Sequence, residues 1–72
     1  MNTKIAENFG EHVKKLRMEK EMFQEEFAEK LSIHRTYMNF IEHGQISPSL
    51  ILIFKISRVL GVKLPELFAF DK

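Results

Sequence analysis

The chain has 72 residues, a formal net charge of +1 from 11 basic and 10 acidic side chains, and no cysteine. This length predicts a single domain over residues 1–72, with no room for a second catalytic or small-molecule effector domain. Without cysteine the chain forms neither disulfides nor thiolate metal sites, which is compatible with a reducing cytosol.

The apolar stretches are too short to cross a membrane. The longest run, Leu50 to Phe54, is far below the ~20 residues that span a bilayer. The first residues lack the apolar core of a signal peptide. We therefore expect a cytoplasmic protein with no membrane partner.

Helical periodicity and breaker residues predict five helices and no strand, which is an all-α fold. Gly44 and Gly61 suit the left-handed ends of the third and fourth helices. Pro48 marks the start of the fourth helix, and Pro65 opens the fifth. The helices are expected at about residues 3–20, 24–31, 35–43, 49–60 and 65–70.

The second and third helices are joined by a corner of only three residues, 32–34, in which Ile33 is expected to fill the angle between them. On the third helix Met38 and Ile41 fall on the inward side. The opposite sector covers about 140° of the helix at 100° per residue. We expect the residues of this sector to have no bonding partner inside the protein. They are Arg35, Thr36, Asn39, Phe40 and His43.

The acidic residues of this region are expected to be solvated rather than catalytic. Residues 24–47 carry two basic side chains and four acidic ones. Three of the acids fall on the outward side of the second helix, namely Glu25, Glu26 and Glu29. Negative charge near the start of a helix is stabilised by the helix dipole. These three acids have no His or hydroxyl partner for acid–base work. We therefore expect no catalytic residues and no enzyme.

These features, in this order, resemble the helix-turn-helix of the Cro/cI-type repressors, the XRE-like family. The resemblance extends from about Phe9 to Phe68 and is greatest to the controller proteins of restriction-modification systems. It implies a five-helix, lambda-repressor-like DNA-binding domain whose helix-turn-helix spans residues 24–43. The matching segments are Phe9 to Arg17, Gln24 to Ala28, Tyr37 to Glu42, Ser47 to Leu50, Leu60 to Val62 and Glu66 to Phe68.

The resemblance also implies the residues that contact double-stranded DNA. Gln24 would hold a phosphate together with the N–H groups that open its helix. Arg35 and Thr36 would read bases, since an arginine can bond guanine O6 and N7 together. Phosphate or base-edge contacts are expected from the remaining residues of this surface, namely Tyr37, Asn39, His43, Gln45 and Ser47.

Three positions depart from the family pattern. Phe40 stands where a long polar side chain is common, and its ring either presses on thymine methyl groups or tucks against the helix. Phe23 stands where a Ser or Thr usually caps the second helix. Ser32 replaces a typical Gly, which is unfavourable if the turn needs a positive φ.

Two further interpretations concern structure rather than DNA contact. The resemblance implies an ion pair between Arg17 and Glu42 that fixes the third helix against the first. His12, His34 and His43 do not share a face at metal-ligand spacing. We therefore expect solvated or phosphate-near imidazoles, no metal site and no cofactor.

The fourth helix has more apolar surface than a monomer needs. Its core stripe is predicted to be Leu50, Ile53, Ile56 and Leu60. Excess apolar area on so small a domain indicates an interface. We expect a homodimer, with reading helices about 34–36 Å apart and therefore a near-palindromic operator. The predicted dimer residues are Ile51, Leu52, Val59, Leu64, Phe68 and Phe70.

The sequence thus predicts a homodimeric, sequence-specific DNA-binding transcriptional regulator, associated with the nucleoid of a bacterium or with phage DNA. Activator and repressor roles both stay open. A phage-type repressor and an antitoxin are alternatives with the same mechanism. A protein-interaction adaptor that has lost DNA binding is an alternative of another class, favoured by Phe40 and the low net charge. Replacement of Arg35 should relax discrimination at particular bases, whereas replacement of Gln24 should weaken all sequences alike.

Overall fold

The computed structural model describes residues 3–70, and within them every regular element is an α-helix. The predicted all-α, five-helix class is therefore confirmed. The first three helices end one residue earlier than predicted, and the fourth begins one residue later. The helices are α1 (Thr3–Glu19), α2 (Gln24–Lys30), α3 (Arg35–Glu42), α4 (Leu50–Leu60) and α5 (Leu64–Leu67).

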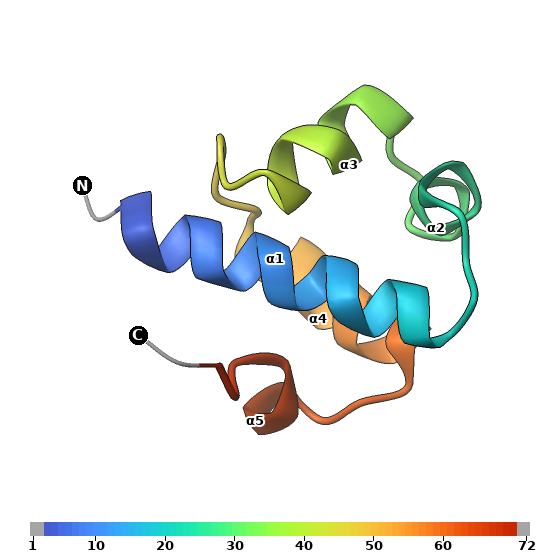
Figure 1. Ribbon diagram of the computed structural model, residues 1–72. Coiled ribbons are helices and arrows are strands. Elements are labelled where there is room, and N and C mark those ends of the chain that lie inside the picture. Colours follow the sequence, from blue (N-terminus) through green and yellow to red (C-terminus); the bar gives the residue numbers. More distant parts are fainter. Residues whose placement is uncertain (1–2, 71–72) are drawn as a thin grey trace.

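In the view of Figure 1, α4 lies behind the middle of α1. The helix α3 packs on α1 and on α2, while α5 packs on α1 and α4. Figure 1 shows α2 and α3 on one side of α1 and α5 on the other. The side of α3 that faces away from α1 is consequently left without a covering helix.

One apolar core joins all five helices. Phe27, Met38, Ile41 and Ile56 are completely buried in it. The α3 residues Met38 and Ile41 are those predicted to face inward. Its other members are Phe9, Val13, Ala28, Leu31, Leu52, Leu60 and Leu67.

The ends of α4 follow from its flanking residues. The Ser49 Oγ accepts a hydrogen bond from the Leu52 N–H at 3.2 Å, so Ser49 caps the helix start. Gly61 adopts a left-handed φ of 70° and ends the helix, as predicted. Pro65 lies in the first turn of α5.

The burial pattern of α4 differs from the predicted one. Leu50 was expected in the core, but 82% of its surface is exposed. Leu52 was expected at a dimer surface, but it is only 6% exposed and belongs to the core. Both predictions were wrong because the buried stripe repeats through Leu52, Ile56 and Leu60. Leu50 lies about 200° from Leu52 around the axis, at 100° per residue.

The helix α5 ends at Leu67, three residues before its predicted end. The N–H groups of Phe68 and Ala69 bond to carbonyls three residues back rather than four, which tightens and closes the last turn. The Phe68 ring then packs on Phe9 of α1, with ring centroids 5.1 Å apart. Among the described residues, no helix is long and apolar enough to span a bilayer.

Candidate nucleic-acid interface

The corner between α2 and α3 has the conformation that a tight turn requires. Leu31 is buried and Ile33 is partly buried against the core, so both apolar side chains anchor the corner. Ser32 adopts a left-handed φ of 60°, so this turn has a positive φ at a residue that is not glycine. This backbone conformation is unfavourable for a serine. The Ile33 N–H bonds to the Ala28 carbonyl at 3.0 Å and closes the turn.

The start of α3 is capped by a histidine. The Nδ1 of His34 accepts a hydrogen bond from the backbone N–H of Thr36 at 3.1 Å. The His34 ring is exposed to solvent, as expected, and one of its nitrogens also satisfies a free N–H of the helix. Phe23, the residue before α2, gives that helix no side-chain cap, as the sequence predicts. Thus a side chain caps the first turn of α3 but not that of α2.

The outward side of α3 is open to solvent. Arg35, Thr36 and His43 are exposed, and Asn39 is half-buried. Phe40 is 40% exposed, so its ring faces outward rather than folding away under the helix. These five side chains therefore share one accessible surface. Tyr37 packs partly against the core, while Gln45 and Ser47 are exposed in the following loop.

A buried ion pair connects this helix to α1. The Arg17 Nε and Nη2 donate to the two carboxylate oxygens of Glu42, at 2.7 and 3.1 Å. The Arg17 Nη1 also donates to the Met22 carbonyl at 2.7 Å. Arg17 is 7% exposed and Glu42 is 4% exposed. The pair that the resemblance implied is thus present, and it ties α1 to the last turn of α3.

Gln24 is engaged inside the protein rather than aimed outward. Its Nε2 donates to the Glu42 Oε1 at 3.0 Å and to the Asn39 Oδ1 at 3.3 Å. Both N–H groups of this amide are therefore used. In this arrangement the Gln24 amide has no N–H to offer a phosphate, which differs from the role that the resemblance implied.

Comparisons with known proteins agree with this geometry. A helix-turn-helix family model, HTH_3, matches residues 13–67. The chain belongs to the helix-turn-helix family. This is a family of DNA-binding transcriptional regulators, not of enzymes.

Several proteins similar to this helix-turn-helix chain are control proteins. It is 47% identical over 66 residues to the control protein C.MunI of a Mycoplasma species, covering 90% of this chain and 89% of the relative. It is 41% identical over 71 residues to the control protein C.BamHI of Bacillus amyloliquefaciens, covering 97% and 88%. A solved structure, the restriction-modification controller protein C.AhdI from Aeromonas hydrophila, superposes with a TM-score of 0.82 at 32% identity, covering 86% and 94%. The predicted likeness to controller proteins is confirmed.

The helix-turn-helix domain also has an exposed apolar surface on α4 and α5. A hollow there is lined only by apolar residues, and three of them, Leu50, Ile53 and Phe54, were not predicted at an interface. Phe54 is 49% exposed, with the Arg58 guanidinium 5.5 Å from its ring centroid. We call this surface the α4–α5 patch; it consists of Leu50, Ile51, Ile53, Phe54 and Leu64.

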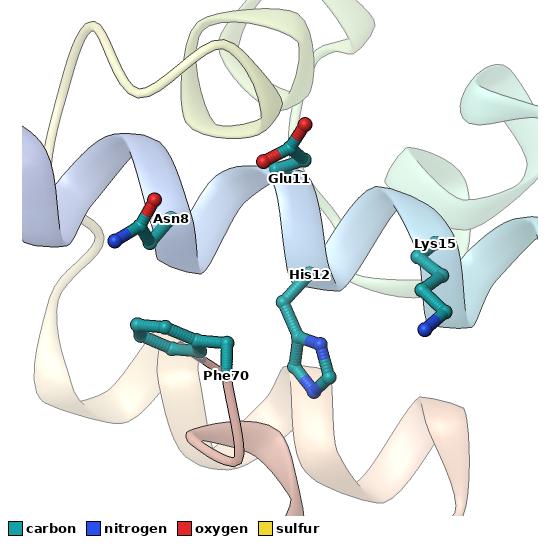
Figure 2. A pocket seen from close by; sticks show the side chains of 5 residues that line it. All are labelled: Asn8, Glu11, His12, Lys15 and Phe70. Atoms are coloured by element: carbon teal, nitrogen blue, oxygen red, sulfur yellow. The ribbon is translucent and has the colours of Figure 1, made fainter. Parts of the chain in front are cut away.

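Two predicted interface residues lie elsewhere on the domain. Phe70 packs against His12 of α1 with tilted rings and centroids 5.7 Å apart, and Phe68 lies between Phe70 and Phe9. Neither phenylalanine lines the hollow of the α4–α5 patch. Figure 2 shows Phe70 beside His12 below α1. Val59 is half-buried against the core.

A second hollow lies beside Phe70 and is lined by Asn8, Glu11, His12, Lys15 and Phe70. Its side chains do not form a catalytic acid–base pair. The His12 Nε2 is 3.1 Å from the Glu66 carbonyl and donates to it, so this exposed bond joins α1 to α5. In Figure 2 the Glu11 carboxylate and the His12 ring extend from opposite sides of α1. An acid–base pair needs its two groups within hydrogen-bond reach, and these two do not converge.

Proposed function

We propose that this chain is a homodimeric regulator that controls transcription in a restriction-modification system. The observation that carries the proposal is the open outward side of α3, where Arg35 and Thr36 are exposed at the first turn of the helix. A helix presented in this way fits the major groove of B-DNA with its first residues at the base edges. The similarity to restriction-modification control proteins supports the restriction-modification assignment.

In this proposal residues 1–72 act as one domain, with residues 24–43 as the reading unit. Arg35 bonds a guanine through O6 and N7, and Thr36 contacts a neighbouring base. Phe40, which cannot bond a base edge, contacts thymine methyl groups. The remaining proposed contacts are to phosphates or base edges and come from Tyr37, Asn39, His43, Gln45 and Ser47.

The α4–α5 patch supports the dimer. Leu50 and Ile51 are 82% and 71% exposed, and Leu64 adds apolar surface beside them. A contiguous apolar surface on so small a domain is typical of an association site. We propose that a second copy of the chain covers it, with Val59, Phe68 and Phe70 at the margin. The twofold axis then gives two half-sites about one helical turn of DNA apart.

The proposed site of action is double-stranded DNA at the nucleoid of a bacterium, or phage DNA, within the cytoplasm. Phage-type repressors and antitoxins would use the same surface. The competing class is an adaptor that binds a protein through α3, and two observations favour it: Phe40 is 40% exposed, and the net charge is only +1. In an adaptor of this kind Arg35 would not need to contact a guanine.

Fluorescence anisotropy with labelled duplex DNA from just upstream of the protein's own gene separates these classes. A DNA reader loses affinity as salt rises, with a slope of about −0.9 in log K against log salt for each phosphate contacted. We expect a slope corresponding to several contacts for each dimer. Binding without measurable salt dependence, or no binding, would favour the adaptor. A footprint on the same DNA then tests for two symmetric half-sites.

A further inference from the structure

The buried ion pair sets the direction of a chain of hydrogen bonds that ends on the reading surface. A guanidinium only donates, and the Glu42 carboxylate accepts from Arg17 with both oxygens. An ionised carboxylate has no proton to donate in return. Any third group that bonds to Glu42 must therefore present an N–H or O–H.

Gln24 is that third group, and its orientation follows. The atom that lies 3.0 Å from the Glu42 Oε1 must be Nε2, because a carbonyl oxygen in that place would face the carboxylate without a hydrogen between them. The second hydrogen of the same amide group is directed at Asn39, 3.3 Å away. Hence the Asn39 atom that faces Gln24 must be the acceptor Oδ1.

The outward atom of Asn39 is fixed in the same way. Since Oδ1 is turned toward α2, Nδ2 is the polar atom left for the solvent side. Among the described residues, every buried side-chain nitrogen and oxygen has a hydrogen-bond partner. Nδ2 has no such partner within residues 3–70, so it is accessible. Asn39 thus presents N–H donors beside Arg35 and Phe40 on the open side of α3.

We propose that Gln24 is a positioning residue that makes Asn39 a hydrogen-bond donor toward a DNA base; this rests on the proposed function. The major-groove acceptors are purine N7, guanine O6 and thymine O4, whereas cytosine presents the N4 donor. Asn39 therefore favours a base edge that presents acceptors, as guanine does, and rejects cytosine at the base it meets. An asparagine free to turn reads adenine with Oδ1 and Nδ2 together, and the hold of Gln24 on Oδ1 removes that option.

The test starts from an operator that the wild-type protein selects from random duplexes. The base pair read by Asn39 is the one at which the Asn39→Ala variant loses discrimination. There, wild-type protein should prefer guanine over cytosine by about 5- to 10-fold, near the lower end of what a base-edge pair supplies. Gln24→Ala should reduce this ratio to that of Asn39→Ala and leave the ratio at the Arg35 base unchanged.

The exposed Glu26 of α2 provides a control outside the proposed contacts, because its side chain has no hydrogen bond within the described residues. Glu26→Gln should leave both ratios unchanged. If Gln24→Ala instead weakens every operator by one common factor and keeps the guanine preference, Gln24 is a phosphate contact and the proposal is overturned. It is equally overturned if Asn39→Ala changes discrimination at no base pair.

A second variant does not depend on the stability of Gln24→Ala. In Asn39→Asp one carboxylate oxygen still accepts from Gln24, while the outward atom changes from a donor to an acceptor. The preference at that base pair should then shift from guanine toward cytosine by more than tenfold in ratio, and an unchanged preference would overturn the proposal. If wild-type protein selects no sequence at all, the proposed function fails together with the inference. A selected operator without these shifts defeats the inference alone.

Discussion

Gly10 of α1 lies so close to the end of α3 that a Cβ placed on it would be 2.1 Å from the Ile41 carbonyl oxygen. The Glu42 carbonyl oxygen would be 2.8 Å away. Gly10 and Arg17 are seven residues apart, which is two helical turns, so both lie on the face of α1 that meets α3. The close approach at Gly10 and the ion pair of Arg17 together hold the reading helix on α1.

Gly10→Ala should therefore destabilise the protein, although alanine favours a helix by about 1 kcal/mol over glycine. The added methyl group meets backbone atoms, which cannot turn aside, so α1 and α3 must separate. We expect a loss of about 1–3 kcal/mol in the free energy of unfolding, measured by urea denaturation. Glu11→Ala, at the exposed neighbouring position, should stay within about 0.5 kcal/mol of wild type. A Gly10→Ala protein as stable as wild type would show that the helices do not approach this closely.

The ion pair makes a second prediction. Arg17→Met leaves the Glu42 carboxylate buried with only the Gln24 amide as a partner, and loss of one member of a buried pair costs about 3–5 kcal/mol. This is most of the stability of a small domain, for which about 5–15 kcal/mol is typical. The double variant that combines Arg17→Met with Glu42→Leu should be more stable than the single one, as urea denaturation can measure. A single variant within about 1 kcal/mol of wild type, the value of an exposed pair, would mean that the pair contributes little.

The His34 cap makes a third prediction. His34→Ala removes the acceptor for the Thr36 N–H, and loss of an N-cap costs about 1 kcal/mol. His34→Asn should retain most of the stability, because an asparagine oxygen is among the best N-caps. Thermal unfolding of the three proteins under one set of conditions checks the order. If His34→Ala unfolds at the wild-type temperature, the imidazole does not cap α3.

The sequence was sufficient to predict the helices and the helix-turn-helix, because these depend on local periodicity and on breaker residues. Gly44 and Gly61 end their helices with left-handed φ values of 72° and 70°. The inward position of Met38 and Ile41 follows from spacing alone. These signals are independent of tertiary contacts, which is why they could be interpreted without them.

The sequence was insufficient wherever a residue's role depends on a partner far along the chain. Leu50 and Leu52 were assigned to the wrong faces because an α4 sequence that is apolar on most sides does not define its own rotation. The close approach at Gly10 is set by α3, some 31 residues later in the sequence. Likewise, the use of both Gln24 N–H groups depends on where Asn39 and Glu42 lie in space.

The α4–α5 patch makes a fourth prediction. Ile51→Glu places a charge in the proposed dimer surface, and an unpaired buried charge is strongly unfavourable. We expect the sedimentation coefficient to change from that of a dimer to that of a monomer at the same concentration. Met18→Glu is the matched control, because Met18 is an apolar residue of another helix and is 58% exposed. If wild type and both variants all sediment as monomers, the proposed dimer is wrong.

The last prediction concerns Arg35, the proposed guanine reader. Arg35→Ala should lose about 1–3 kcal/mol of discrimination at one base pair of each half-site. Arg35→Lys separates charge from geometry, since lysine keeps the positive charge but lacks the planar fork that bonds O6 and N7 together. It should keep more of the overall affinity and the salt dependence than Arg35→Ala, while losing the base preference. Competition anisotropy with singly substituted operators at one fixed salt concentration measures the base preference, and a salt series with the selected operator measures the rest.

Lys30 supplies the comparison for Arg35, because it is an exposed cation at the end of α2 and not on the outward side of α3. Lys30→Ala should change no base preference, whatever it does to overall affinity, because a charge that reaches only phosphates carries no sequence information. Preservation of every base preference in both Arg35 variants would exclude Arg35 as a base reader. The polar side chains that remain on this surface, Thr36, Asn39 and His43, would then have to supply the specificity through single hydrogen bonds, and discrimination at each base would be correspondingly smaller.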